Sequence, residues 1–135
     1  MKIALIDTDI LSMFFRGNKE VVAQFKKYLE QHDRVNISIL TYYEILSGLI
    51  HKGATKQLEL FHEFISQCDI LAMTEESVSY SAKIYAEIRA KGKPVDDIDI
   101  LIAGIAIEHC ATLVTHNTRH FLRISGLTVE DWSES

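Results

Sequence analysis

The sequence predicts an α/β domain in which a central, mostly parallel sheet is covered by helices on both faces. Short apolar runs alternate with segments of helical periodicity, and polar side chains follow directly after two of those runs, at residues 7 and 115–117. Strands that alternate with helices favour a parallel sheet with helical crossovers. Ligands of such sheets gather beyond the carboxyl ends of the strands, which marks these polar side chains as the candidate site.

Five short segments are candidate strands, which implies a sheet of four to five strands. Residues 2–6 form an apolar run typical of a strand buried on both faces. Residues 35–39 are short and rich in β-branched side chains. The other candidates are residues 70–73, 112–114 and, as an edge strand, 127–130.

Helices are predicted between these strands, over residues 8–15, 19–31, 40–50, 55–66, 75–90, 98–109 and 119–122. Thr8 or Asp9 is expected to cap the first of them. In the helix over residues 75–90, the side chains of Val78, Ala82, Tyr85 and Ile88 share one apolar face. The helix over residues 98–109 is apolar nearly all round, so we expect it to be buried.

Length and composition indicate one folded domain over residues 1–135. Hydrophobic residues make up 47% of the chain, and a chain of this length buries roughly two thirds of its unfolded surface. The first residues lack the pattern of a secretory signal, and the longest apolar stretch, residues 98–107, is too short to span a membrane. We therefore expect a soluble, cytoplasmic protein that does not bind membranes, with Cys68 and Cys110 as buried thiols.

The net charge of −5 argues against a simple basic surface for nucleic acid. It does not exclude a nuclease, because cations bound at an acidic site reverse the local charge. Asp7 follows a predicted buried strand, and Asp99 lies in the first turn of the helix predicted to be buried. Helix capping is the simpler explanation for both, and a solvated helix face is the simpler explanation for Glu44.

Four segments, in order, resemble the pattern of PIN-domain ribonucleases, and in particular of the VapC-type toxins. They are residues 6–11 (IDTDIL), 39–48 (ILTYYEILSG), 99–104 (DILIAG) and 113–121 (LVTHNTRHF). The closing residues 125–132 (SGLTVEDW) also resemble the end of VapC-type toxins. Each segment alone is a weak signal, but the ordered set covers essentially the whole chain and is fairly specific.

The resemblance implies a three-layer α/β/α PIN domain whose acidic cluster binds Mg²⁺ or Mn²⁺. By position, Asp7, Glu44 and Asp99 match the three main acidic residues and would be metal ligands, while Thr115 and Asn117 match the polar residues that orient the site. Many members carry a fourth acidic residue where this chain has His120. That departure leaves the number of metal ions open.

The resemblance also implies the reaction and the partners. The expected activity is endonucleolytic hydrolysis of RNA phosphodiester bonds, with Glu44 as a ligand or as the group that positions the attacking water. His116 and His120 are expected near the site, within reach of phosphate. The expected partners are a second copy of the chain in a homodimer and a VapB-type antitoxin, whose basic tail would enter the acidic groove.

Three alternatives remain open at this point. Asp7 and Asp9 after an apolar strand also resemble the nucleophile motif of haloacid-dehalogenase phosphatases, although the Gly-Asp pair of that family does not occur here. A phosphoacceptor signalling domain would need an aspartate at the end of the third strand, and residues 70–74 offer none there. The third alternative is a PIN-like binding module that has lost catalysis, against which the three retained carboxylates argue.

Overall fold

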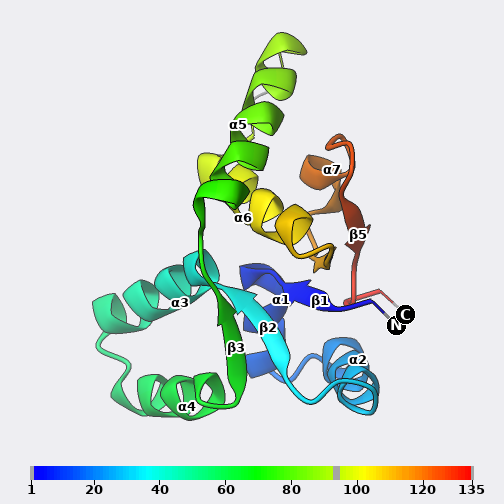
Figure 1. The fold of residues 1–135 in the computed structure, drawn as a ribbon. Helices are drawn as coiled ribbons and strands as arrows, with labels where there is room; N and C mark the ends of the chain where they lie inside the picture. Colours follow the sequence, from blue (N-terminus) through cyan, green and yellow to red (C-terminus); the bar gives the residue numbers. More distant parts are fainter. Residues whose placement is uncertain (1, 93–94, 135) are drawn as a thin grey trace.

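Parallel strands form the centre of the computed structural model, which describes residues 2–92 and 95–134 (Figure 1). In this described part the sheet has five strands in the order β3-β2-β1-β4-β5. They are β1 (Ala4–Ile6), β2 (Val35–Ser38), β3 (Cys68–Leu71), β4 (Thr112–Val114) and β5 (Thr128–Glu130). All four pairings are parallel, which confirms the predicted sheet. β1 lies at its centre and is buried throughout, as its apolar sequence predicts.

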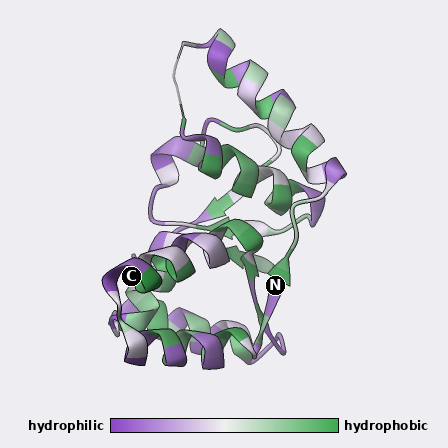
Figure 2. Cartoon of the chain, turned by 90° about the vertical axis from the view of Figure 1, so that its left-hand side faces the viewer, coloured by the Kyte–Doolittle hydropathy of each residue, from purple (hydrophilic) through white to green (hydrophobic). Residues whose placement is uncertain are grey.

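The helices lie in two layers, one on each face of the sheet (Figures 1 and 2). The first layer contains α1 (Thr8–Phe15), α2 (Lys19–Leu29), α3 (Ile39–Lys52) and α4 (Thr55–Ile65). The second contains α5 (Glu75–Ala90), α6 (Asp97–Glu108) and α7 (Thr118–Phe121). Neighbouring residues of β1 serve different cores, since Ile6 packs with the first layer and Leu5 with the second. The predicted α/β/α architecture is therefore confirmed.

Helix α6 lies in the core, as its nearly continuous apolar surface predicts, but the buried face of α5 matches the predicted one only at Ile88. Val78 and Tyr85 remain 42% and 44% exposed. The buried side chains of α5 are Ser77, Ser81, Ile84 and Ile88. Ile88 belongs to the predicted face and is buried, so apolar periodicity predicted the buried face only in part.

The reason lies in the close approach of α5 and α6 at Gly104. A Cβ at this position would collide with the Ser81 hydroxyl and the Ser77 carbonyl oxygen. Ser81 Oγ lies 3.1 Å from the Ser77 carbonyl oxygen and 3.0 Å from that of Ile100, so the buried hydroxyl is satisfied. Small residues with satisfied hydroxyls allow the two backbones to pack closely.

Smaller differences concern the ends of elements and the thiols. β3 begins at Cys68, two residues earlier than predicted, because Cys68 pairs with Val35 in the sheet. Asp7, rather than Thr8 or Asp9, is the N-cap of α1. Cys68 is buried as expected, whereas Cys110 is exposed. Among the described residues, none of the helices has the length and apolar character needed to cross a membrane.

Candidate functional site

The sheet brings Asp7 and Thr115 together at the carboxyl ends of two neighbouring strands. Ile6 of β1 pairs with Val114 of β4, so the residues that follow them meet at the same edge. The Thr115 hydroxyl donates to Asp7 Oδ2 at 2.9 Å, and the Thr8 amide donates to Asp7 Oδ1 at 2.8 Å. Asp7 is only 6% exposed. Its carboxylate is thus fixed in place in a buried setting.

Burial makes the charge on Asp7 unfavourable. It raises the pKa of this carboxyl from 3.8 to about 7, with further contributions from the neighbouring carboxylates of Asp9 and Asp99. The hydrogen bonds from Thr115 and Thr8 act in the opposite direction but do not cancel the rise. A cation beside Asp7 would relieve both the desolvation and the repulsion.

Glu44 reaches this region from α3, in the first layer of helices. Its Oε1 accepts a hydrogen bond of 2.6 Å from the hydroxyl of Thr8, which also lies 3.0 Å from the Thr41 hydroxyl. Glu44 is half-buried, so a freely solvated helix face does not describe it. Thr8 stands next to Asp7 in the sequence and therefore ties Glu44 to the strand end that carries Asp7. Sequence reasoning assigned Thr8 only a capping role.

Asp99 lies in the first turn of α6 and is not used as a cap. The N-cap is Asp96, whose side chain makes no capping hydrogen bond. Burial raises the pKa of Asp99, and the carboxylates of Asp96 and Glu44 raise it further, while His120 acts against the rise. Asp99 therefore lies close enough to both Asp7 and Glu44 for their charges to interact, although the three residues come from separate segments.

His120 and Asn117 line the same region from the start of α7. His120 Nδ1 lies 2.8 Å from Asn117 Nδ2 and 3.6 Å from Asp99 Oδ2. One ring nitrogen cannot accept from the amide and donate to the carboxylate at once, so the two groups compete for it. At the position where many PIN domains carry an acidic residue, this chain thus places a histidine that contacts Asp99.

The donor set suits a hard divalent cation by its chemistry. Mg²⁺ prefers oxygen ligands and commonly binds through one or two carboxylates while it keeps several waters. Within residues 2–92 and 95–134, however, no three His, Cys, Asp or Glu side chains already stand in a metal-binding arrangement. The carboxylates therefore fit a cation by type and by charge, and small side-chain movements or intervening waters would complete the coordination.

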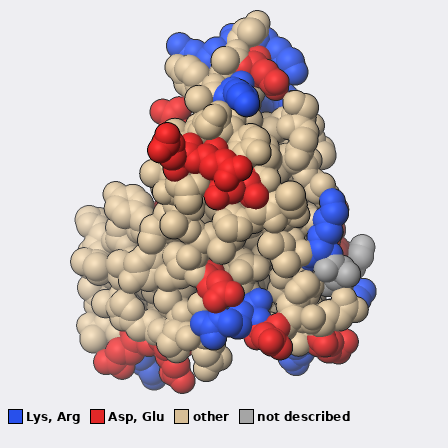
Figure 3. Space-filling model, in the orientation of Figure 1, with Lys and Arg blue, Asp and Glu red and all other residues tan. Residues whose placement is uncertain are grey.

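Acidic side chains also gather on the surface of this part of the molecule. Figure 3 shows a patch of Asp and Glu where the beginnings of α5 and α6 lie, whereas Lys and Arg cluster at the far end of α5. Asp96 is exposed at the start of α6 and approaches Asp99. Asp97 instead borders a depression on the outside of α5 and α6, together with Val78 and Tyr85.

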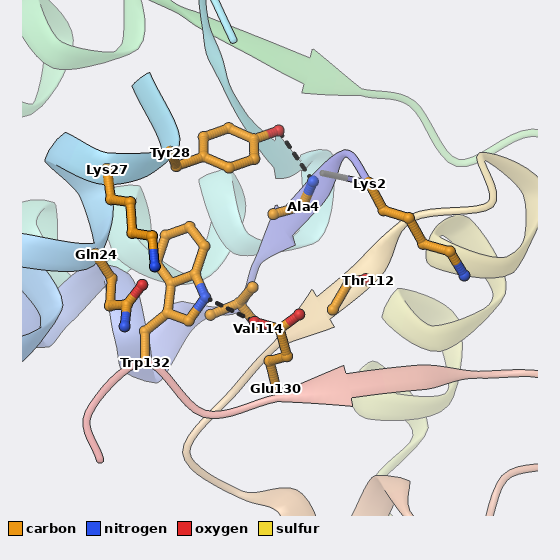
Figure 4. A pocket seen from close by; sticks show the side chains of 9 residues that line it. All are labelled: Lys2, Ala4, Gln24, Lys27, Tyr28, Thr112, Val114, Glu130 and Trp132. Atoms are coloured by element: carbon orange, nitrogen blue, oxygen red, sulfur yellow. Dashed lines mark hydrogen bonds between the residues drawn. The ribbon is translucent and has the colours of Figure 1, made fainter. Parts of the chain in front are cut away.

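A separate cavity lies at the opposite ends of the same strands. It has a volume of about 220 Å³ and borders Ala4 and Thr112, the first residues of β1 and β4 (Figure 4). Tyr28 and Trp132 form its aromatic wall, with the Tyr28 hydroxyl 3.0 Å from the Ala4 amide nitrogen. None of the five predicted site residues lines this cavity.

The chain is similar to known proteins over almost its whole length. The sequence model of the PIN-domain family matches residues 4–127. The tRNA(fMet)-specific endonuclease VapC of Shigella flexneri is 32% identical over 130 residues, which cover 96% of this chain and 97% of the relative. The DNA-bound VapBC structure from Salmonella typhimurium superposes with a TM-score of 0.86 at 29% identity, over 98% of this chain and 99% of the other. VapBC2 of Rickettsia felis, bound to a promoter DNA fragment, gives 0.86 at 26% identity, over 96% and 98% of the two chains.

Proposed function

The chain belongs to the PIN-domain family, and on that premise we propose that it is a metal-dependent endoribonuclease, the toxin of a toxin–antitoxin pair. The proposed reaction is hydrolysis of internal phosphodiester bonds of RNA. The observation that carries this proposal is the buried carboxylate of Asp7, which the Thr115 hydroxyl holds in place. Burial and the neighbouring carboxylates of Asp9 and Asp99 raise its pKa. We take residues 1–135 as one PIN domain.

PIN-domain nucleases generally use divalent metal ions, and we propose Mg²⁺ or Mn²⁺ here. When bound, such an ion holds a phosphate oxygen, lowers the pKa of a water and neutralises charge on the leaving oxygen. Asp7 and Asp99 are the proposed ligands, directly or through water. Glu44 is the third ligand or orients the attacking water, and the Thr8 hydroxyl fixes it for that task.

Thr115 and Asn117 are proposed to orient the site. Thr115 donates to Asp7 Oδ2 and accepts a hydrogen bond of 3.1 Å from the Asn117 amide nitrogen. Its single hydroxyl proton goes to Asp7, because Asp9 Oδ2 is farther away at 3.5 Å, and this hydrogen bond holds Asp7 Oδ2 in place. The Asn117 side chain turns toward His120 instead and limits the positions that this ring can take.

The proposed partners are an RNA substrate, a second copy of the chain and an antitoxin of the VapB type. The solved neighbours are toxin–antitoxin complexes, some of them bound to DNA. An apolar groove of about 440 Å³ between α1, α3 and α4 supports a protein partner, since Phe15 and Leu60 remain 43% and 55% exposed there. We expect Leu60→Glu to raise the antitoxin concentration needed to block cleavage, and Leu122→Glu, at an exposed site outside the groove, to leave it unchanged.

Cleavage of RNA by the purified protein tests the proposed function. The wild type, Asp99→Asn and Asp33→Asn are compared with Mg²⁺, with Mn²⁺ and with EDTA. Asp33 is exposed between α2 and β2, so its variant controls for the loss of one negative charge. We expect cleavage that requires the metal, falls at least about 100-fold in Asp99→Asn and persists in Asp33→Asn.

Two other outcomes would contradict the proposal in different ways. Equal cleavage by Asp99→Asn would mean that the active site lies elsewhere. A folded wild-type protein that binds RNA and cuts none of a total cellular RNA pool would favour the binding module without catalysis.

A further inference from the structure

The C-terminal segment brings a second polar cluster to the edge of the acidic site. β5 pairs with β4 in a register that places Glu130 opposite Val114, and the Thr115 amide donates to the Glu130 carbonyl oxygen at 2.9 Å. Just beyond these two strand ends, the side chains of His116 and Asp131 come together. His116 Nδ1 is 3.0 Å from Asp131 Oδ2 and 2.9 Å from Ser133 Oγ.

The hydrogen bonds of this cluster determine which nitrogen of His116 carries the proton. The Ser133 hydroxyl donates to Asp131 Oδ1 at 2.6 Å, so toward the ring it can offer only a lone pair. Asp131 accepts as well. Burial raises the pKa of Asp131, but the hydrogen bonds from Ser133 and His116 outweigh it and lower the pKa overall, which favours the carboxylate. Both neighbours of Nδ1 are therefore acceptors, and the proton of a neutral ring belongs on Nδ1.

This assignment leaves Nε2 as a hydrogen-bond acceptor. The ring can present it to a ligand, because the His116 side chain is 55% exposed while that of Asp131 is only 7% exposed. Asp131 and Ser133 thus hold the ring at Nδ1, while the exposed side chain leaves Nε2 accessible.

Trp132 anchors the segment that carries Asp131 and Ser133. Its ring is 5% exposed and packs edge-on against Phe25 at 5.5 Å. Its indole nitrogen lies 3.3 Å from Glu130 Oε1, as Figure 4 shows. A large buried aromatic side chain with a satisfied N–H is a stable attachment for a chain end. The residues on either side of Trp132 are therefore held in position.

The acidic site lies directly beside this cluster. The His116 amide donates to Asp9 Oδ2 at 3.1 Å, and Thr115, its neighbour in the sequence, donates to Asp7. A strand of RNA whose scissile phosphate sits at the acidic site would place the adjoining ribose and phosphate groups near His116.

We propose that His116 Nε2 accepts a hydrogen bond from a ribose 2′-hydroxyl of the substrate next to the scissile phosphate. The inference rests on the proposed ribonuclease function and adds a residue that distinguishes RNA from DNA. The reason is one of hydrogen-bond types. Phosphate and ring oxygens of the RNA backbone only accept, so the 2′-hydroxyl is the one backbone donor that an acceptor nitrogen can bind. Asp131 and Ser133 are positioning residues, because they act on the substrate only through His116.

A cycle that combines a protein variant with a chemical change in the RNA tests this contact. The RNA is an oligonucleotide with one mapped cleavage site, carrying a single 2′-deoxy or 2′-O-methyl ribose at each position around that site. We expect one position where either change lowers kcat/KM of the wild type about 3- to 10-fold, as for the loss of one hydrogen bond. In His116→Phe, which keeps a ring but has no acceptor, the same change should cost less than about 2-fold.

The positioning role has a readout that needs no activity. Long-range ¹H–¹⁵N correlations of the imidazole ring should show the Nδ1–H form for the neutral His116 of the wild type. Asp131→Asn and Ser133→Ala should raise the Nε2–H population and reduce the 2′-hydroxyl discrimination together. Glu134→Gln, an exposed change in the same segment, should alter neither.

Several results would overturn the inference without touching the proposed nuclease. Equal sensitivity of the wild type and His116→Phe to every 2′ change would remove the contact. Coupling of His116 to a methylphosphonate substitution instead would identify a phosphate contact. If no RNA is cut, the proposed function fails separately, and fluorescence anisotropy with the same oligonucleotides tests the contact. RNA binding that depends on the 2′-hydroxyl in the wild type but not in His116→Phe supports the contact. RNA binding that does not depend on the 2′-hydroxyl in the wild type overturns it.

Discussion

Helix α6 contains two regions that meet opposite demands. In its first turn Asp99 lies half-buried among other carboxylates, and its pKa is raised by burial and by their charges. About one and a half turns later Gly104 packs so closely against α5 that no side chain fits, and the neighbouring Ser81 hydroxyl is fully hydrogen-bonded. The middle of the helix is arranged for stability. Its first turn, by contrast, holds a carboxylate in surroundings that disfavour its charge, as is common at functional sites.

The largest expected effect is the pH dependence of the free energy of unfolding that the buried carboxylate of Asp7 causes. The pKa of Asp7 is about 7 in the folded protein, against 3.8 for the free group. The unfolded chain therefore loses its proton at lower pH, and the free energy of unfolding of the metal-free protein falls as pH rises from about 4 to about 7. A difference of about three pKa units corresponds to about 4 kcal/mol.

Asp7→Asn removes this pH dependence because the amide does not ionise. Urea unfolding with EDTA at pH 5 and pH 8 should show a much smaller pH effect in the variant, and at pH 8 the variant should be more stable than the wild type. It should also have lost its RNA cleavage. A wild type that becomes more stable between pH 5 and pH 8 would contradict the buried, unfavourable charge on Asp7.

A divalent cation should recover part of the lost stability. At 100 times its Kd, a ligand that binds only the folded protein adds about 2.7 kcal/mol to the free energy of unfolding. We expect Mg²⁺ or Mn²⁺ to raise the Tm of the wild type at pH 8, and to raise the Tm of Asp7→Asn by much less. Buffer without divalent cations, brought to the same ionic strength with NaCl, is the control for screening. Equal rises in both proteins would place the cation elsewhere.

A substitution at Gly104 tests how much the close packing of α6 against α5 stabilises the protein. Gly104→Ala introduces a Cβ that collides with the Ser77 carbonyl oxygen and the Ser81 hydroxyl, and we expect a loss of about 2 kcal/mol. Gly48→Ala is the matched control, because nothing lies within 4 Å of a Cβ there. In the helix α3 this change should stabilise by about 0.5–1 kcal/mol. Thermal unfolding of the two variants with EDTA measures the contrast, and equal effects would refute the close contact.

The smallest effect should come from the hydrogen bond that joins Thr8 of α1 to Glu44 of α3. Thr8→Val keeps the shape of the side chain but removes the hydroxyl that donates to Glu44 at 2.6 Å. Cleavage should fall about 10-fold, as when a supporting hydrogen bond of a metal site is lost, with the free energy of unfolding changed by less than about 1 kcal/mol. Thr118→Val is a control on the other layer. An unchanged rate in Thr8→Val would mean that Glu44 needs no such support.

The succession of strands and helices, and the polar residues that follow β1 and β4, could be predicted from the sequence. Those features depend on local periodicity and on the rule that parallel strands align their carboxyl ends, so Asp7 and Thr115 were predicted to meet. The ordered motifs also identified the family, with Glu44 and Asp99 as candidates. These inferences need no knowledge of which face of a helix touches which neighbour.

Features that depend on contact with a distant segment could be read only from the three-dimensional structure. The buried face of α5 contains Ser77 and Ser81, whereas Val78 and Tyr85 are exposed. Only small side chains fit where α5 approaches Gly104 of α6, and the apolar pattern of α5 does not reveal this contact. The bond from Thr8 to Glu44 and the cluster around His116 join residues far apart in the chain. Hydrogen bonds of this kind are set by strand register and helix packing, which one sequence does not encode in any local pattern.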